Sequence, residues 1–229
     1  MMADEFAVPG DDAAGDRLTE MQDAPTGGAD LDVGPEDRDR VALYGLLASG
    51  LQGPVGQDWL DVVSGLSGGA GDLADAIAAL AKAASEADPK KLARDYHDLF
   101  IGVGRGELVP YGSYYLTGFL NEKPLALLRQ DMRRLGMERD PEVKEPEDHI
   151  AALCQMMAGL IEGEFGDGSA TAPSRFFRAH LATWAPYFFK DLAATDSGAV
   201  YPALGRLGQV FIELEDHADA LFAERRGAV

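Results

Sequence analysis

Cysteine, basic residues and long apolar runs are scarce in this sequence, and each shortage excludes a class of protein. The single cysteine, Cys154, has no partner for an internal disulfide, and with four scattered histidines it forms none of the usual zinc-ligand spacings. Twenty lysines and arginines stand against 39 aspartates and glutamates, which gives a formal charge of −19. So acidic a chain repels phosphate backbones and anionic lipids, and we expect no nucleic-acid partner. These shortages favour a protein of the reducing cytoplasm without a metal or other cofactor.

Signals for export and membrane insertion are also lacking. The amino terminus, MMADEFAVPGDD, has no basic stretch followed by an apolar one, as a secretory signal would. No uninterrupted apolar segment approaches the roughly 18 residues that a membrane-spanning helix needs. We therefore expect no stable membrane insertion. With 229 residues and 46% hydrophobic side chains, the chain is long enough to bury one sizeable core.

Residues 1–35 differ in composition from the rest of the chain. They are rich in Asp, Gly, Ala and Pro, and residues 1–40 hold twelve acidic residues against three arginines. Such a segment cannot bury enough apolar area to offset the entropy of ordering it. The sequence therefore predicts a disordered acidic tail over 1–35, to which we assign no function, followed by a folded domain over 36–229.

Apolar residues in the folded part recur at steps of three and four, the period of amphipathic helices, while alternation with period two is nearly absent. This pattern predicts an all-α protein with a single compact helical domain. A glycine-rich, aperiodic stretch over 102–118 is expected to be a structured loop, and a charged connector over 138–146 is expected to act as a hinge. Such a hinge permits either a monomer or a domain-swapped dimer. The predicted helical stripes run over 41–51, 73–84, 92–100, 125–135, 150–161, 177–192 and 204–221.

The end of the connector gathers four carboxylates and one imidazole, in the sequence EVKEPEDH over 142–149. Pro146 is expected to open the helix that follows, and acidic residues in a first turn oppose the helix dipole, so an ordinary helix amino end is the simpler explanation. In a helix, however, Asp148 would project with the small face of Ala152 and Gln155. Together with His149 it would then line a groove for a cationic, partly apolar ligand, because guanidinium groups pair bidentately with carboxylates.

The segment 102–107, GVGRGE, resembles a phosphate cradle only weakly, because it lacks the GK[ST] ending of a P-loop and follows no strand. A nucleotide hydrolase with Asp148 as base would also need a phosphate-binding lysine or a metal-binding acid that the motif does not supply. It is therefore a remote alternative. Downstream, Tyr111, Ser113 and Tyr115 belong to an aromatic cluster that forms either core lining or the wall of a peptide groove.

Three stretches in combination resemble the TorD/DmsD/NarJ family of redox-enzyme maturation chaperones, and more closely its TorD-like branch. The resemblance extends from about residue 39 to about residue 224. It implies an all-helical fold and no catalytic turnover. The stretches are YHDLFIGVGRGELVPYGSYYL at 96–116, PLALLRQDMRRLGM at 124–137 and KEPEDHIAALCQMMAGLI at 144–161.

The resemblance further implies a cytoplasmic chaperone that binds the twin-arginine signal peptide of a molybdenum-cofactor oxidoreductase subunit and delays its export until the cofactor is loaded. A NarJ-like assembly factor, which grips the mature part of a respiratory reductase, is the alternative. Gly112 and Tyr114 depart from the usual family pattern and bear on the choice of client. The family's binding determinants carry over to Glu145, Pro146, Asp148 and His149, and its aromatic loop to Pro110, Tyr111, Ser113 and Tyr115; we add Glu147 as a further carboxylate for the arginines.

Overall fold

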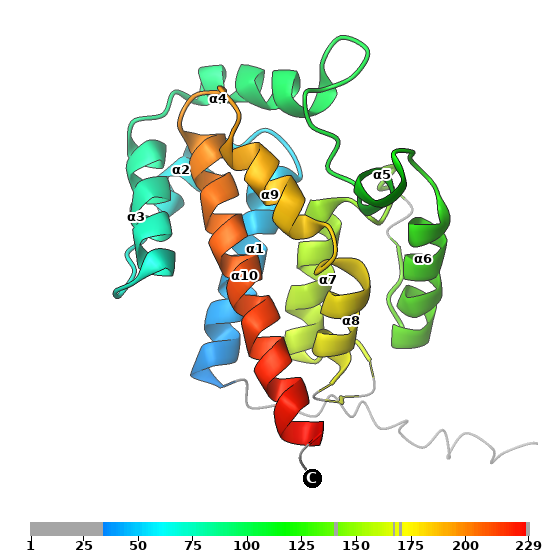
Figure 1. Ribbon diagram of the computed structural model, residues 1–229. Helices are drawn as coiled ribbons and strands as arrows, with labels where there is room; N and C mark the ends of the chain where they lie inside the picture. Colours follow the sequence, from blue (N-terminus) through cyan, green and yellow to red (C-terminus); the bar gives the residue numbers. More distant parts are fainter. Residues whose placement is uncertain (1–33, 140–141, 167, 170, 228–229) are drawn as a thin grey trace, which may run out of the picture.

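The computed structural model describes residues 34–139, 142–166, 168–169 and 171–227, with side chains as far as residue 221. Within these residues the chain is helical and contains no strand, only one isolated antiparallel bridge between Tyr111 and His149 (Figure 1). The prediction of an all-α fold with one helical domain is confirmed. The acidic tail predicted over 1–35 lies outside the described residues, apart from its last two positions.

The helices follow the predicted stripes, with two additions. Their bounds are α1 Pro35–Leu51, α2 Gln57–Ser64, α3 Asp72–Ser85, α4 Pro89–Tyr96, a π-helical turn His97–Ile101, α5 Gly112–Thr117, α6 Lys123–Leu135, α7 Ile150–Glu162, α8 Ala172–His180, α9 Ala185–Ala193 and α10 Val200–Gly227. None of the described helices is both long and apolar enough to span a bilayer.

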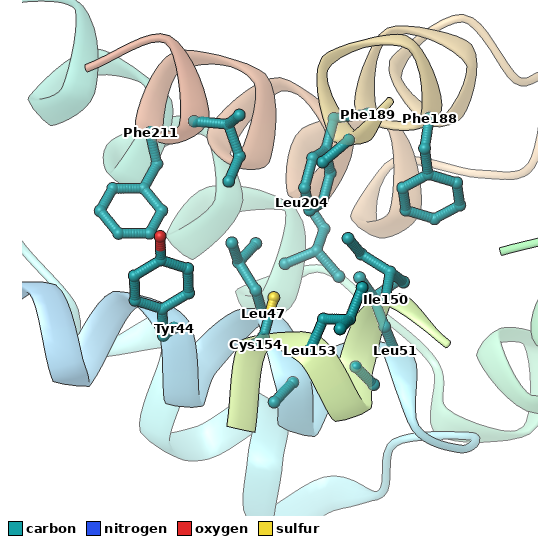
Figure 2. Close-up of a cluster of buried hydrophobic side chains, with 14 of the residues drawn as sticks. Tyr44, Leu47, Leu51, Ile150, Leu153, Cys154, Phe188, Phe189, Leu204 and Phe211 are labelled. Atoms are coloured by element: carbon teal, nitrogen blue, oxygen red, sulfur yellow. The ribbon is translucent and has the colours of Figure 1, made fainter. Parts of the chain in front are cut away.

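The core forms where α1 packs against α7, and α10 against α9 and α3. Figure 2 shows how side chains from these helices meet in one apolar layer. Each of these side chains is at most 3% exposed, and burying one stabilises the fold by about 1.5–3 kcal/mol relative to leaving it in water. The residues labelled there are Tyr44, Leu47, Leu51, Ile150, Leu153, Cys154, Phe188, Phe189, Leu204 and Phe211.

Glycines allow α10 to lie unusually close to α9. A Cβ atom at Gly205 would lie 2.4 Å from the backbone nitrogen of Ala193, and one at Gly208 would lie 2.2 Å from Cδ1 of Phe189. Both distances are far below van der Waals contact. At Gly205 the neighbour is backbone, so no larger residue fits without moving one helix, whereas at Gly208 the ring of Phe189 would have to shift. The close approach therefore depends on the missing side chains.

Two predictions about the helices are wrong. The stripe over 177–192 is not one helix, because the chain turns at 181–184 before α9, whose second residue is Pro186. Pro186 has no N–H to donate to the carbonyl of residue 182. The Trp184 amide donates to the carbonyl of Leu181 at 3.1 Å, and the carbonyl of His180 accepts from Trp184 Nε1 at 2.6 Å instead. The stretch 102–118 is not a loop throughout, because residues 112–117 form α5.

Candidate functional site

The connector between α6 and α7 ends in a strand-like segment that lies against the start of α5. The carbonyl of Pro110 accepts from the Ile150 amide at 2.9 Å, and the carbonyl of Asp148 accepts from the Gly112 amide at 3.0 Å. These two bonds tie the EPEDH motif to the aromatic loop, which the sequence resemblance had placed in one site. The structure thus brings the two motifs together, although about 35 residues separate them.

The predicted start of the last helix in this region is wrong. Pro146 does not open α7, which begins at Ile150 with His149 as its N-cap. The side chain of His149 performs the capping, since its Nδ1 accepts from the Ala151 amide at 3.1 Å. None of the preceding carboxylates caps this helix, so the ordinary-helix-end explanation does not account for them.

A cleft of about 790 Å³, which we call the first cleft, opens beside this segment. Its walls come from the π-helical turn, the turn after α1, α6, α7 and the connector. Methionine and aromatic side chains dominate its apolar lining, and methionine adapts readily to irregular apolar partners. These residues are Tyr96, Phe100, Tyr111, Met132, Met137, Met156 and Phe165.

Carboxylates mark the rim of the first cleft. Glu138, Glu145 and Glu164 are exposed and line it, together with the less accessible Glu147. Arg139 is the one lysine or arginine among the described residues of the lining. It donates to the carbonyl of Val143 at 2.6 Å and is thereby held against the connector. The rim is therefore acidic.

Tyr111 and Glu145 meet directly at this rim. The hydroxyl of Tyr111 donates to Oε2 of Glu145. Burial and the neighbouring carboxylate raise the pKa of Tyr111 well above its usual range, so the phenol stays protonated. Its ring also packs edge-on against His149, with 5.1 Å between ring centroids and 79° between planes. Three of the predicted site residues thus form one contiguous group.

His149 is neutral at physiological pH. Burial lowers its pKa to about 4, although the carboxylates of Glu145 and Asp148 oppose this shift. Because Nδ1 accepts from the Ala151 amide, the proton of the neutral ring lies on Nε2. Nε2 has no hydrogen-bond partner among the described residues, and His149 lines the first cleft. It offers one uncharged donor to a ligand.

Glu147 is held by two arginines of the protein. It is 8% exposed, accepts from Arg129 at 2.7 and 3.0 Å, and lies 3.6 Å from Arg139. Burial is the largest single influence and disfavours its charge, but the hydrogen bonds from Arg129, a backbone hydrogen bond and the positive charges of Arg129 and Arg139 together outweigh burial and hold the pKa of Glu147 below its ordinary value. The structure therefore gives Glu147 a role in fixing the connector against α6.

Asp148 does not share the groove with Ala152 and Gln155, as the helical projection predicted. It is 3% exposed and turns towards α5, where Oδ2 accepts from the Ser113 amide at 2.7 Å. Ala152 and Gln155 line the first cleft without it. The prediction failed because Asp148 precedes α7 and lies in a turn, closed by a hydrogen bond from the His149 amide to the carbonyl of Pro146, so the helical projection does not apply to it.

Ser113 and Tyr115 belong to α5 and do not line the first cleft. Ser113 is fully buried. The hydroxyl of Tyr115 donates to Asp191 of α9 at 2.9 Å, and its ring lies 5.5 Å from that of Trp184. These contacts hold α5 against α9 and so position the loop that carries Tyr111.

Several residues of the first cleft escaped the sequence analysis. Gln52 comes from the turn after α1, Met132 from α6 and Phe165 from the turn after α7. Met132 and its helix were predicted, but only as core. No local pattern could have found the set, because tertiary packing alone brings these segments together. Among the described residues, no group of three or more His, Cys, Asp and Glu side chains could hold a metal ion.

An apolar cleft with an acidic rim, set in a helical domain, has the chemistry to accommodate cationic and apolar groups. A family model, described as that of the nitrate reductase delta subunit, matches residues 68–190, which is more than half of the chain. The chain belongs to this family, and the resemblance to the TorD/DmsD/NarJ redox-enzyme maturation chaperones is confirmed.

Relatives of known name agree with this assignment. The chaperone protein TorD of Vibrio cholerae serotype O1 is 36% identical over 143 residues, which cover 58% of this chain but only 65% of that protein. TorD of Shewanella loihica is 28% identical over 211 residues, 82% of this chain and 96% of that one. A crystal structure described as that of a redox enzyme maturation protein from Archaeoglobus fulgidus has the same fold, with a TM-score of 0.51, 20% identity, and coverage of 77% of this chain and 93% of that one.

Proposed function

We propose that this chain is a chaperone that binds the twin-arginine signal peptide of a molybdenum-containing oxidoreductase subunit in the cytoplasm, and that it acts by binding alone, without catalytic turnover. It would hold the precursor back from export until the cofactor is inserted. The observation that carries the proposal is the first cleft, where a methionine and aromatic lining lies under a rim of exposed glutamates. Relatives named as TorD chaperones support the same function.

The chemistry of the cleft suits such a peptide. Guanidinium groups pair with carboxylates, and the exposed glutamates at 138, 145 and 164 can meet the two arginines of the signal. The apolar stretch that follows the arginines would pack on the methionines and aromatic rings. A volume of about 790 Å³ holds a few side chains, so the cleft would grip the arginines and the start of the apolar stretch rather than the whole peptide.

Net charge supports the encounter. A formal charge of −19 attracts a cationic peptide from a distance, and ions screen this attraction. Association should therefore slow as salt rises, whereas the apolar contacts in the cleft should persist.

The geometry gives no support to the nucleotide hydrolase. Asp148 is buried against α5, and Arg105 of the glycine-rich loop packs over the ring of Tyr114, 5.5 Å from its centroid, and donates to its hydroxyl at 3.0 Å. The loop 102–107 presents no lysine. The NarJ-like alternative requires a contact with the mature part of the enzyme.

Calorimetric titration tests the proposal. The ligand is a twin-arginine signal peptide from a molybdoenzyme precursor encoded beside this chain, and the control peptide carries glutamine in place of both arginines. We expect micromolar binding, about −8 kcal/mol, that weakens with added salt and with loss of the arginines. Equal heats from the two peptides would contradict recognition by the acidic rim. The absence of heat from both would direct the search to the mature enzyme.

A further inference from the structure

Four large apolar side chains are exposed together on α5, α6 and the connection between these helices. Leu116 of α5 and Leu127 of α6 are 46% and 49% exposed and line the same small cavity. Phe119 and Leu120, in the connection, are 69% and 44% exposed. Figure 1 shows both helices at one flank of the molecule, and we call these four residues the flank patch. Exposed apolar clusters of this kind are typical of surfaces that bind another polypeptide.

Basic residues continue this surface along α6. The helix holds four lysines and arginines against one aspartate, although the whole chain has a formal charge of −19. Lys123 and Arg134 lie four residues before and seven residues after Leu127, and these spacings bring all three to one face of the helix. Lys123 is exposed and has no ion-pair partner among the described residues, whereas Arg134 pairs with Asp131 at 3.0 Å. This face therefore combines apolar and cationic side chains.

α8 packs against α6 and extends the positive charge. It holds Arg175 and Arg178 and no acidic residue. Arg178 is bound by Asp219, but Arg175 is exposed and has no ion-pair partner in the part of the chain that the structure describes. Ala179 lines the same small cavity as Leu127, and Arg175 lies one turn before Ala179 on the same face of α8. Cations from two helices thus border the flank patch.

Two other parts of the surface have only one of these features. Val62 and Leu66, at the end of α2, are 69% and 36% exposed, but α2 has two aspartates and no lysine or arginine. α4 has Lys90, Lys91 and Arg94, but no large apolar side chain is exposed among its residues, all of which the structure describes. The flank patch with its basic border suits a different ligand, a polypeptide that is both acidic and apolar.

Residues 1–33 of the same chain have this composition. They hold nine aspartates and glutamates against one arginine, and Phe6, Val8, Leu18 and Met21 lie among them. A segment of this length spans at most about 110 Å, whereas a compact domain of about 190 residues has a radius of gyration of about 16 Å, so the segment can reach every face of the domain. Its covalent link to α1 keeps it at a roughly millimolar effective concentration, so weak contacts are sufficient to hold it.

We propose that the acidic segment 1–33 binds the flank patch of its own chain. Its carboxylates pair with Lys123, Arg134 and Arg175, and its apolar side chains cover the exposed leucines and Phe119. The acidic rim of the first cleft repels the same segment, so the peptide site stays open. The inference goes beyond the proposed function, because it concerns another surface and holds whether or not a signal peptide binds the first cleft.

Paramagnetic broadening tests this contact in the full-length chain. Cys154 is fully buried, and burial raises the pKa of its thiol well above its usual range, so it does not react with a thiol-directed spin label. A cysteine introduced by Ala14→Cys therefore carries the only label. We expect the label to broaden the ¹³C methyl signals of the flank-patch leucines and to leave those of Val62 and Leu66 sharp. Equal broadening at the two places, or none at either, would overturn the inference.

Two double variants with the same change of charge locate the contact. Lys123→Glu with Arg175→Glu reverses two cations beside the flank patch, and Lys90→Glu with Arg94→Glu reverses two on α4. All four residues are exposed and have no ion-pair partner among the described residues. We expect the first variant to lower the ratio of docked to free segment about fivefold, the effect of losing one or two exposed ion pairs, and the second to leave it unchanged. Equal effects of the two variants would contradict docking at the flank patch.

A mixed sample separates the segment of the same chain from that of a second copy. In it, spin-labelled chains without ¹³C are combined with ¹³C-labelled chains without the spin label. Sharp flank-patch signals in the mixed sample support the inference, whereas broadening as strong as in the doubly labelled chain overturns it and assigns the patch to a second copy. Methionine methyl signals report on the first cleft and show independently whether a signal peptide binds there, so failure of the proposed function leaves this result unaffected.

Discussion

Asp148 and His149 are neighbours in the chain, yet they line different cavities. His149 lines the first cleft, whereas Asp148 turns to α5 and lines a second cavity of about 320 Å³ between α5, α6 and α8. The extended backbone at His149, with φ −63° and ψ 136°, produces this division, and hydrogen bonds to the 110–112 segment fix it. The EPEDH motif therefore contributes side chains to two separate cavities. Substitutions at its successive positions should have separable effects.

The free energy of unfolding should decrease as pH falls, because protonation of His149 is disfavoured in the folded protein. Its pKa is lowered to about 4 in the folded protein, while the unfolded chain takes up a proton near pH 6.5. Its contribution is therefore complete above pH 6.5 and is lost as pH falls towards 4. His149→Asn retains an N-cap acceptor and should reduce the loss of unfolding free energy between pH 7.5 and pH 5 by about 1–2 kcal/mol. Urea denaturation at the two pH values measures this.

The matched control for that measurement is His217→Asn, at an exposed position of α10. It should lose as much stability on acidification as the parent protein. His180 also has a lowered pKa, so His149→Asn reduces the pH dependence without removing it. An unchanged pH dependence in His149→Asn would show that His149 becomes charged without cost in the folded state.

The close packing of α9 and α10 should depend on Gly205. Gly205→Ala places a methyl group 2.4 Å from the Ala193 nitrogen, and backbone cannot rotate away as a side chain can. We expect a loss of about 1–3 kcal/mol in unfolding free energy. Gly45→Ala, on the exposed side of α1 with nothing within 4 Å, should instead be neutral or stabilise by up to about 1 kcal/mol. Equal effects of the two changes would argue against the close approach.

Periodicity was sufficient to predict most of the helices because burial in this fold follows it. Tyr44, Leu47 and Leu51 recur at steps of three and four, and all are buried. Gly136 ends α6 in a left-handed conformation, as its place after the last apolar residue predicted. These features are local, because interactions between residues a few positions apart in the chain determine them.

Long-range contacts decided what the sequence analysis missed. Pro146 has the local features of a helix start, but the pairing of 148–150 with 110–112 delays α7 until Ile150. The same pairing turns Asp148 away from the groove in which it was predicted. The family resemblance correctly joined the two motifs in one region. It could not distribute their residues between two cavities.

Tyr115 provides a test of the site as the resemblance defined it. Its hydroxyl bonds Asp191 and its ring packs on Trp184, away from the first cleft. We expect Tyr115→Phe to lose about 1 kcal/mol of unfolding free energy, through the lost hydrogen bond, and to bind the signal peptide as tightly as the parent protein. Calorimetry and thermal unfolding measure the two effects. A loss of affinity in a fully folded variant would show that Tyr115 contributes to binding of the signal peptide.

Glu145 should be a principal contact for the arginines of the signal peptide. It is exposed at the rim of the first cleft, and among the described residues its carboxylate accepts a hydrogen bond only from the neutral hydroxyl of Tyr111. We expect Glu145→Gln to weaken peptide binding by about tenfold in low salt and to flatten its salt dependence, because one charge-assisted pair is lost. Glu86→Gln removes the same charge from an exposed position just after α3, so long-range attraction falls equally in both variants. If the two variants bind alike, overall charge attracts the peptide and the rim does not recognise it; if only Glu145→Gln weakens binding, the arginines dock at this carboxylate.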